Sequence, residues 1–410
     1  MGAKWEKIVY VAVNLLISSF NFIRSFVFLN YLNFFELGQI TILQTLIQLI
    51  NTLQLGFLNG GYRIFSLRKE INAKRVNETI FTYIFIVSVV AGIFLTISYF
   101  IGSIQDGSVV IFGVVTGVLS ICSNWLTNVY IATQKINSLN RINFVSNIIA
   151  FSSLLFLNKI GIYAAMLSFF IQPIALVVLI FIETKELIPK RFYFTLNTAK
   201  WILSFGFIPY LSGIFSYANI QIERWSVNYL LGTEEVGKFY LAIAYAAIYA
   251  LVPTSLNNLF FPKAMQYFSN KEFSLFSKYI QSYFLILLAY SIITILLTLF
   301  LSEHLIIYFF PKHLENLKYV FLTLPGLAAI HLIAPIGLVF NASLHLKPIL
   351  WAYASSSLFL MIGISFMAYV KLYNLSNFAL LNSSVNIYIS IFFVLSFLLL
   401  YKSLKTNISD

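Results

Sequence analysis

Stretches of about 20 apolar residues recur along the whole chain, and they constrain its fold more than any other feature. A helix of that length crosses the ~30 Å hydrocarbon core of a bilayer. A closed barrel, the other spanning structure, needs strands that alternate apolar and polar residues, and runs such as 83–100 and 283–301 show no alternation. Only 10% of the 410 residues are charged, against about 25% in a soluble domain. We therefore expect an all-α integral membrane protein.

The apolar runs between charged clusters predict about twelve transmembrane helices. The first run is longer than a signal-peptide core of about 7 to 15 residues, so we interpret it as an uncleaved helix. The predicted helices lie at residues 8–31, 37–59, 79–102, 109–132, 142–157 and 161–182 in the first half, and at 202–231, 237–261, 280–302, 317–341, 348–370 and 378–401 in the second.

Basic residues in the loops predict the orientation, because Lys and Arg are retained on the cytoplasmic side of a membrane. With both termini inside, 19 of the 26 basic residues lie in cytoplasmic segments and five lie in outer loops. The two that remain, Arg24 and Arg224, fall within predicted helices. We expect a multi-pass protein with both termini in the cytoplasm.

Several classes of protein fit the composition poorly. The net charge of +12 sits in short loops and not on one soluble face with base-stacking aromatics, so we expect no nucleic-acid partner. A single cysteine, Cys122, precludes an intrachain disulfide and a Cys-rich metal site. The chain has no Gly-x-x-x-x-Gly-Lys-Ser/Thr phosphate loop. We expect a membrane transporter with no cofactor and no metal, while a membrane-embedded polysaccharide polymerase or glycosyltransferase stays open as an alternative.

A similar phrase occurs in both halves of the chain, where one helix ends and the next begins. The first half reads Arg24, Asn30-Tyr31-Leu32 and Glu36-Leu37-Gly38, and the second reads Arg224, Asn228-Tyr229-Leu230 and Glu235-Val236-Gly237. Both halves start inside, so a duplication would relate them by an axis along the membrane normal; chance similarity is the alternative. We predict an N-terminal six-helix lobe at 1–182, a cytoplasmic linker at 183–200, a C-terminal six-helix lobe at 201–401 and a cytoplasmic tail at 402–410.

Arg24 and Arg224 are the first candidates for a substrate site. An arginine at helix depth costs at least ~2.5 kcal/mol, so it should face the bundle interior or a watery cavity unless it snorkels to the surface. Each lies at the edge of a polar stripe with helical spacing, within 14–25 and 212–223. We interpret these stripes as the lining of a cavity between the two halves, with snorkelling as the alternative.

Other polar side chains extend this candidate site. Arg63, in an inner loop, would gather an anionic headgroup at the cytoplasmic mouth, although retention of positive loops also explains it. Amides at helical spacing either line the cavity or hold helices together at roughly 0.6–2 kcal/mol per hydrogen bond. The candidate substrate-binding residues are Arg24, Arg224, Arg63, Asn21, Gln44, Gln48, Asn51, Asn124 and Asn219.

Two titratable side chains are candidates for coupling to an ion gradient. Glu223 is the one acid placed deep in a predicted helix, and local compensation of the Arg224 charge is its alternative role. His331 lies between Pro325 and Pro335 in the predicted tenth helix, where a packing role is the alternative.

The chain resembles the polysaccharide flippases, which translocate O-antigen or capsule repeat units and belong to the multidrug/oligosaccharidyl-lipid/polysaccharide (MOP) exporter superfamily. The resemblance covers the size, the twelve helices and an arginine late in the first helix followed by Glu36-Leu37-Gly38. It also covers Glu223-Arg224, Leu231-Gly232, Gly237 and Tyr240-Leu241-Ala242, which are similar to the family's signature at its seventh and eighth helices.

The resemblance implies V-shaped lobes around a central cavity and export by alternating access. The implied cargo is an undecaprenyl-diphosphate-linked oligosaccharide, moved across a bacterial inner membrane among membrane lipids and other polysaccharide assembly proteins. Arg24 and Arg224 would bind the diphosphate or acidic sugars, since a guanidinium grips phosphate oxygens at two points. The amides, with aromatics such as Trp125, Tyr217 and Tyr245, would line the sugar path.

A cation-coupled exporter of small molecules is a further alternative. Related multidrug exporters often rely on a carboxylate in the first helix, and this chain has none there before Glu36. The energy source therefore stays open, with a proton or sodium gradient as the expectation.

Overall fold

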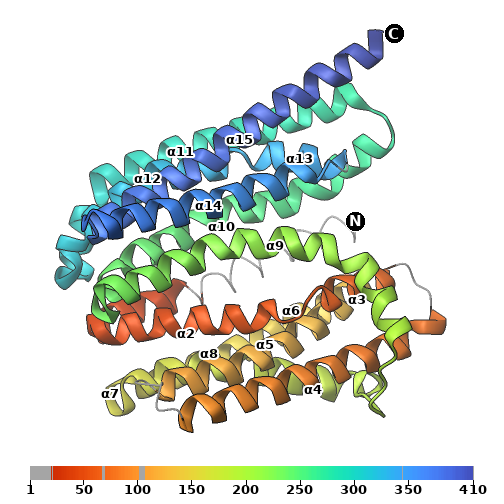
Figure 1. The fold of residues 1–410 in the computed structure, drawn as a ribbon, viewed down its shortest axis with the longest axis horizontal. Coiled ribbons are helices and arrows are strands. Elements are labelled where there is room, and N and C mark those ends of the chain that lie inside the picture. The colour runs from red at the N-terminus through yellow and green to blue at the C-terminus, as the bar shows by residue number, and fades with distance from the viewer. Residues whose placement is uncertain (1–19, 21, 67–69, 101–106, 344, 410) are drawn as a thin grey trace. The chain divides into compact units, whose positions relative to one another are not determined.

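Helices make up all the regular structure in the described part of the chain (Figure 1). The computed structural model describes residues 20, 22–66, 70–100, 107–343 and 345–409. The fold divides into two compact units, Met1–Ile214 and Phe215–Asp410. The prediction of an all-helical membrane protein built from two lobes is confirmed.

The first unit contains the counterparts of the first six predicted helices. Residues 22–31 are helical, and the earlier part of the first predicted helix lies outside the described residues. The elements that follow are α2 (Phe34–Thr52), α3 (Phe57–Ser66), α4 (Glu70–Phe100), α5 (Gly107–Ala132), α6 (Ile136–Ser152), η1 (Ser153–Phe156), α7 (Leu157–Ile160), α8 (Ile162–Glu183), η2 (Lys185–Leu187) and the first part of α9 (Leu196–Leu231).

The predicted helix at 37–59 is two helices, because the chain bends by 62° between α2 and α3. Gly56 has a φ of +92°, which glycine adopts at little cost. Two tyrosine hydroxyls donate to carbonyl groups at the end of α2, Tyr83 to Leu53 at 2.5 Å and Tyr210 to Thr52 at 2.6 Å. A broken helix at membrane depth is tolerated when neighbouring side chains satisfy the freed backbone in this way.

Glycine also allows α3 and the first part of α9 to pack backbone against backbone. A Cβ built on Gly206 would overlap the carbonyl oxygen of Gly56, and one built on Gly60 would overlap that of Ile202. Small residues permit such close approach between membrane helices. The first part of α9 is therefore fixed to the first unit.

Residues of the predicted linker at 183–200 contact α4 within the first unit. Arg191 forms an ion pair with the buried carboxylate of Glu78, with Nε and Oε2 3.1 Å apart. The backbone amide of Tyr193 donates to the hydroxyl of Thr82 at 2.9 Å. Side chains of α4 thus fix the position from which α9 starts.

The second unit contains the rest of α9 and the counterparts of the last five predicted helices. These are α10 (Thr233–Ser269), α11 (Phe273–Phe309), α12 (Leu317–Leu332) with α13 (Ala334–Ala342), α14 (Lys347–Tyr369) and α15 (Leu375–Ser409), with η3 (Pro311–Asn316) before α12. Both α10 and α11 have 37 residues, which is about 55 Å of helix and more than the hydrocarbon core requires. Their ends extend beyond the predicted apolar runs for that reason.

Helices pair in the same way in both units, as a duplication predicts. In the first unit α2 packs on α5, α5 packs on α8, and α6 packs on α8; in the second, α10 packs on α12, α12 on α15, and α14 on α15. The repeated phrase also takes the same place, because Glu36 is the third residue of α2 and Glu235 is the third residue of α10. In α2 this glutamate forms a capping box with Asn33, and in α10 it pairs with Lys238.

Nine described helices are long and apolar enough to cross a membrane, and the bent pair of α2 and α3 makes up to ten. α9 is the counterpart of the predicted seventh helix, and the first predicted helix lies largely outside the described residues. Large apolar side chains on α11, such as Leu285, Ile293 and Phe300, remain exposed, as expected for a surface that faces lipid. The chain is a multi-pass membrane protein.

Candidate transport site

The predicted polar stripe of α9 packs against two helices of its own unit. The Asn219 amide donates to the Ser356 hydroxyl at 2.8 Å and accepts from the Ser357 hydroxyl at 2.7 Å, both on α14. One turn later, Glu223 lies 5% exposed against α15. In this structure Asn219 therefore joins two helices, which is the alternative role that the sequence left open for such amides.

Glu223 is the buried end of a short polar chain. Its Oε2 accepts a hydrogen bond from the amide of Asn382 at 2.7 Å, and the Asn382 oxygen accepts from the amide of Asn386 at 3.2 Å. The second carboxylate oxygen, Oε1, is buried and has no hydrogen-bond partner among the described residues. Burying an ionised carboxylate without a partner is costly, so a proton or a cation at Oε1 would stabilise this arrangement.

Arg224 follows Glu223 but does not pair with it. Adjacent residues of a helix point about 100° apart, and the structure gives no ion pair between the two side chains. The Arg224 side chain is half-buried, and no hydrogen bond or ion pair is found for it within the described residues. The two side chains form no direct ion pair, but their opposite charges attract each other, so compensation of the Arg224 charge stays the alternative role of Glu223.

Arg24 occupies the matching position in the first unit and contacts an aromatic ring. Its guanidinium carbon lies 4.0 Å from the centre of the Phe169 ring on α8, and the side chain is half-buried. A guanidinium can stack on a ring through its face and donate hydrogen bonds through its edge at the same time.

The amides on α2 and α5 are partly brought together. The amide of Asn124 on α5 donates to the side-chain oxygen of Asn51 on α2 at 3.3 Å, so the two candidates meet. Gln44 and Gln48 are half-buried on α2, and Arg63 is exposed on α3. Asn21, also a candidate, lies outside the described residues.

His331 and one of the predicted path aromatics have packing roles. The His331 ring on α12 stacks on the ring of Tyr249 on α10, with 5.4 Å between ring centres. Trp125 is fully buried in the core of the first unit and donates to Asn77 at 2.9 Å. The expectation that Trp125 lines a sugar path is wrong for this conformation, because its ring fills space between α3, α4 and α5. Tyr217 is exposed, and the hydroxyl of Tyr245 forms a hydrogen bond with that of Thr298.

The sequence reasoning missed the partners of α9. Asn382 and Asn386 lie one turn apart on α15, and Ser356 and Ser357 lie on α14, all within helices that the sequence predicts. Their spacing was a visible signal, since residues four apart share a helix face. Within the described residues no three His, Cys, Asp or Glu side chains gather as they would around a metal ion.

Comparison with known proteins identifies the fold. No family model and no curated protein matches the chain by sequence. Among solved structures, the lipid II flippase MurJ in an inward closed conformation matches with a TM-score of 0.71 and 15% identity, over 95% of this chain and 87% of that one. The chain has the fold of this flippase.

Two further structures with this fold support the assignment. An inward-facing multidrug resistance MATE family transporter of the MOP superfamily matches with a TM-score of 0.65 and 12% identity, over 98% of this chain and 99% of that one. A point mutant of the MATE transporter VcmN from Vibrio cholerae matches with a TM-score of 0.60 and 12% identity, over 97% and 96% of the two chains. The predicted resemblance to the MOP superfamily is confirmed at the level of the fold.

Proposed function

We propose that this protein is a flippase that moves an undecaprenyl-diphosphate-linked oligosaccharide across a bacterial inner membrane by alternating access. The observation that carries the proposal is the pair of arginines at matching positions of the duplicated fold. A half-buried guanidinium such as that of Arg224, which forms no direct ion pair among the described residues, is stabilised by an anionic ligand. A diphosphate offers oxygen atoms to which arginine donates in two-point fashion. The likeness in fold to a lipid II flippase supports the same class of cargo.

The function is tested by transport in proteoliposomes that contain a fluorescent lipid-linked oligosaccharide. The wild type should expose the headgroup to a quencher outside, and Arg24→Ala and Arg224→Ala should each abolish this exposure. Arg141→Ala is the matched control, because Arg141 is an exposed arginine that pairs with Glu183 at the end of α8. Wild-type transport in both arginine variants would indicate that these side chains snorkel to the membrane surface and do not bind the substrate.

The main competing function is export of a small cationic molecule. The likeness in fold to MATE transporters favours it, whereas the half-buried positive charge of Arg224 disfavours a cationic substrate at that position. Ethidium loaded into the same proteoliposomes separates the two. Ethidium efflux with a headgroup that stays in its starting leaflet would overturn the flippase proposal, and lengthening of the sugar chain would indicate an enzyme.

We further propose that Glu223 couples transport to a proton or sodium gradient. The buried Oε1 without a described partner, next to the amide chain of Asn382 and Asn386, supports this role. Glu223→Gln keeps an acceptor for Asn382 but cannot ionise. Its transport should no longer respond to an imposed gradient, while Glu272→Gln, at an exposed loop position, should respond like the wild type.

A further inference from the structure

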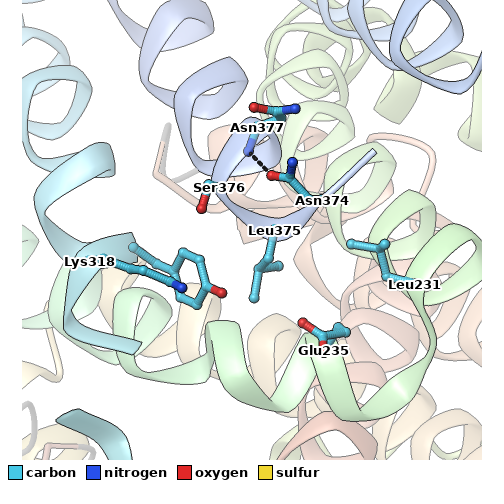
Figure 2. A pocket seen from close by; sticks show the side chains of 8 residues that line it. Leu231, Glu235, Lys318, Asn374, Leu375, Ser376 and Asn377 are labelled. Atoms are coloured by element: carbon cyan, nitrogen blue, oxygen red, sulfur yellow. Dashed lines mark hydrogen bonds between the residues drawn. The ribbon is translucent and has the colours of Figure 1, made fainter. Parts of the chain in front are cut away.

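A cavity of about 600 Å³ lies at the end of the second unit where α9 ends and α10, α12 and α15 begin (Figure 2). Every residue that lines it belongs to the second unit. The distribution of basic residues assigns this end to the outer side of the membrane, the side on which a flipped headgroup is released. The cavity is separate from the site around Glu223 and Arg224, and nothing above assigns it a ligand.

The lining of the cavity is mostly polar and carries both signs of charge. Figure 2 shows the Lys318 amine, the Ser376 hydroxyl and the Glu235 carboxylate around the side chain of Leu375. Asn374 is held in place by accepting a hydrogen bond from the backbone amide of Asn377 at 2.9 Å. The lining therefore offers both hydrogen-bond donors and acceptors.

Tyr319 is the tyrosine that lines this cavity. Its side chain lines the cavity although the residue is only 7% exposed, and Phe239 packs against its ring at 6.2 Å. The Lys318 amine lies 5.1 Å from the centre of the same ring, so packing and a cation–π contact hold the ring in place. The hydroxyl of a tyrosine that lines a cavity can donate to and accept from the hydroxyl groups of a ligand.

The charges of the cavity indicate the kind of ligand. An anion such as a free phosphate would be attracted by Lys318 alone, because the Glu235 carboxylate and Lys238, 2.7 Å apart, offset each other. A neutral ligand rich in hydroxyl groups can use the carboxylate as an acceptor and the ammonium as a donor at once. Leu231 and Leu375 supply the apolar wall that the C–H face of a sugar ring requires.

We propose that this cavity binds a hexopyranose unit of a carbohydrate at the outer end of the second lobe. The cavity is open on one side, and its volume of about 600 Å³ is enough for one or two sugar rings. The inference rests on the proposed function for its biological meaning, since the sugar would belong to the headgroup just delivered. The cavity would then hold that headgroup on the outer side and oppose its return.

The binding test uses the full chain in lipid nanodiscs free of glycoside detergent, whose headgroup would compete. Saturation-transfer NMR is recorded with methyl glucoside, methyl galactoside, methyl mannoside, N-acetylglucosamine, rhamnose and glucuronate, and with inorganic phosphate. At least one sugar should bind. Loss of one hydrogen bond in Tyr319→Phe should weaken that binding by about two- to tenfold. Ser376→Phe, which fills the cavity, should abolish it.

Lys371→Ala is the matched control for Lys318→Ala, because both lysines are exposed at this end and only Lys318 lines the cavity. Lys318→Ala should weaken sugar binding and Lys371→Ala should not. The proposal is overturned if no sugar binds, if Ser376→Phe binds sugar like the wild type, or if phosphate binds and the sugars do not. All variants must show the thermal transition of the wild type, and Tyr319→Phe retains the ring packing if the larger substitution does not fold.

Transport is measured separately, so that the two proposals fail independently. Sugar binding without transport of the lipid-linked oligosaccharide would overturn the flippase and leave the carbohydrate site. Transport without sugar binding would overturn the carbohydrate site and leave the flippase. If both stand, Ser376→Phe should lower net accumulation of the headgroup outside without reducing binding of the lipid-linked substrate.

Discussion

Gly206→Ala should destabilise the protein because Gly206 on α9 touches the backbone of α3. A Cβ at this position would overlap the carbonyl oxygen of Gly56 and lie 2.5 Å from the amide nitrogen of Gly60. These are backbone atoms, so no side-chain rotation removes the overlap. The two helices would have to separate, which loosens contacts such as the hydrogen bond from Tyr210 to Thr52.

The expected magnitude follows from two opposing effects. Over-packing of a well-packed contact costs about 1–3 kcal/mol. Alanine gains up to ~1 kcal/mol over glycine from helix propensity. Gly213 on the same helix is the matched control, because a Cβ there would meet no atom within 4 Å in the described structure. Since the propensity gain is common to both variants, their stabilities should differ by the clash alone, about 1–3 kcal/mol.

The free energy of unfolding is measured by titrating protein in mixed micelles with sodium dodecyl sulfate and following tryptophan fluorescence. The chain has five tryptophans, and Trp201 lies in the part of α9 that packs on the first unit. Gly213→Ala should match or exceed the wild type, and Gly206→Ala should fall below it. Equal stabilities of the two variants would refute the close approach of α3 and α9.

Three further changes probe the packing of polar groups. Asn219→Leu removes two hydrogen bonds to α14 and should lower the free energy of unfolding by about 1–3 kcal/mol, measured in the same titration; an unchanged value would contradict the helix-joining role. Arg191→Ala leaves its buried carboxylate partner unpaired and should cost more than Arg141→Ala, whose partner is partly exposed; equal losses by thermal unfolding would count against this difference. Trp125→Phe puts a smaller ring in a fully buried site and leaves the Asn77 oxygen without its donor, so thermal unfolding should start earlier; an unshifted transition would contradict this packing and hydrogen-bonding role.

The helices were predictable from the sequence because the bilayer sets their length. Each predicted span has a helical counterpart, apart from the first, whose earlier part lies outside the described residues. The break between α2 and α3 was not predictable from the apolar run alone. It depends on Gly56 and on hydroxyl groups supplied by Tyr83 and Tyr210, which are 30 and 158 positions from the carbonyls they bind.

The candidate site was predictable only in part, and for a physical reason. Arg24 and Arg224 are conspicuous because a charge inside an apolar run is costly. A stripe of polar residues shows which face of a helix is polar but not which helix lies opposite. The sequence therefore suggests a ligand for Asn219, whereas in the folded chain its amide forms hydrogen bonds with the hydroxyls of Ser356 and Ser357.

The two lobes pair their helices in the same way but differ in the chemistry at the matching arginine. Aligning Arg24 with Arg224 places Ile23, an exposed apolar residue, opposite the buried carboxylate of Glu223. An arginine is present in both lobes, so we expect both arginines to bind the substrate. Coupling to a gradient needs only one ionisable group, and Glu223 is present in one lobe alone. Arginine substitutions in either lobe should therefore lower transport at every imposed gradient, whereas Glu223→Gln should leave downhill transport in place and remove only its dependence on the gradient. An arginine variant that lost only the gradient dependence would contradict this division of tasks between the two positions.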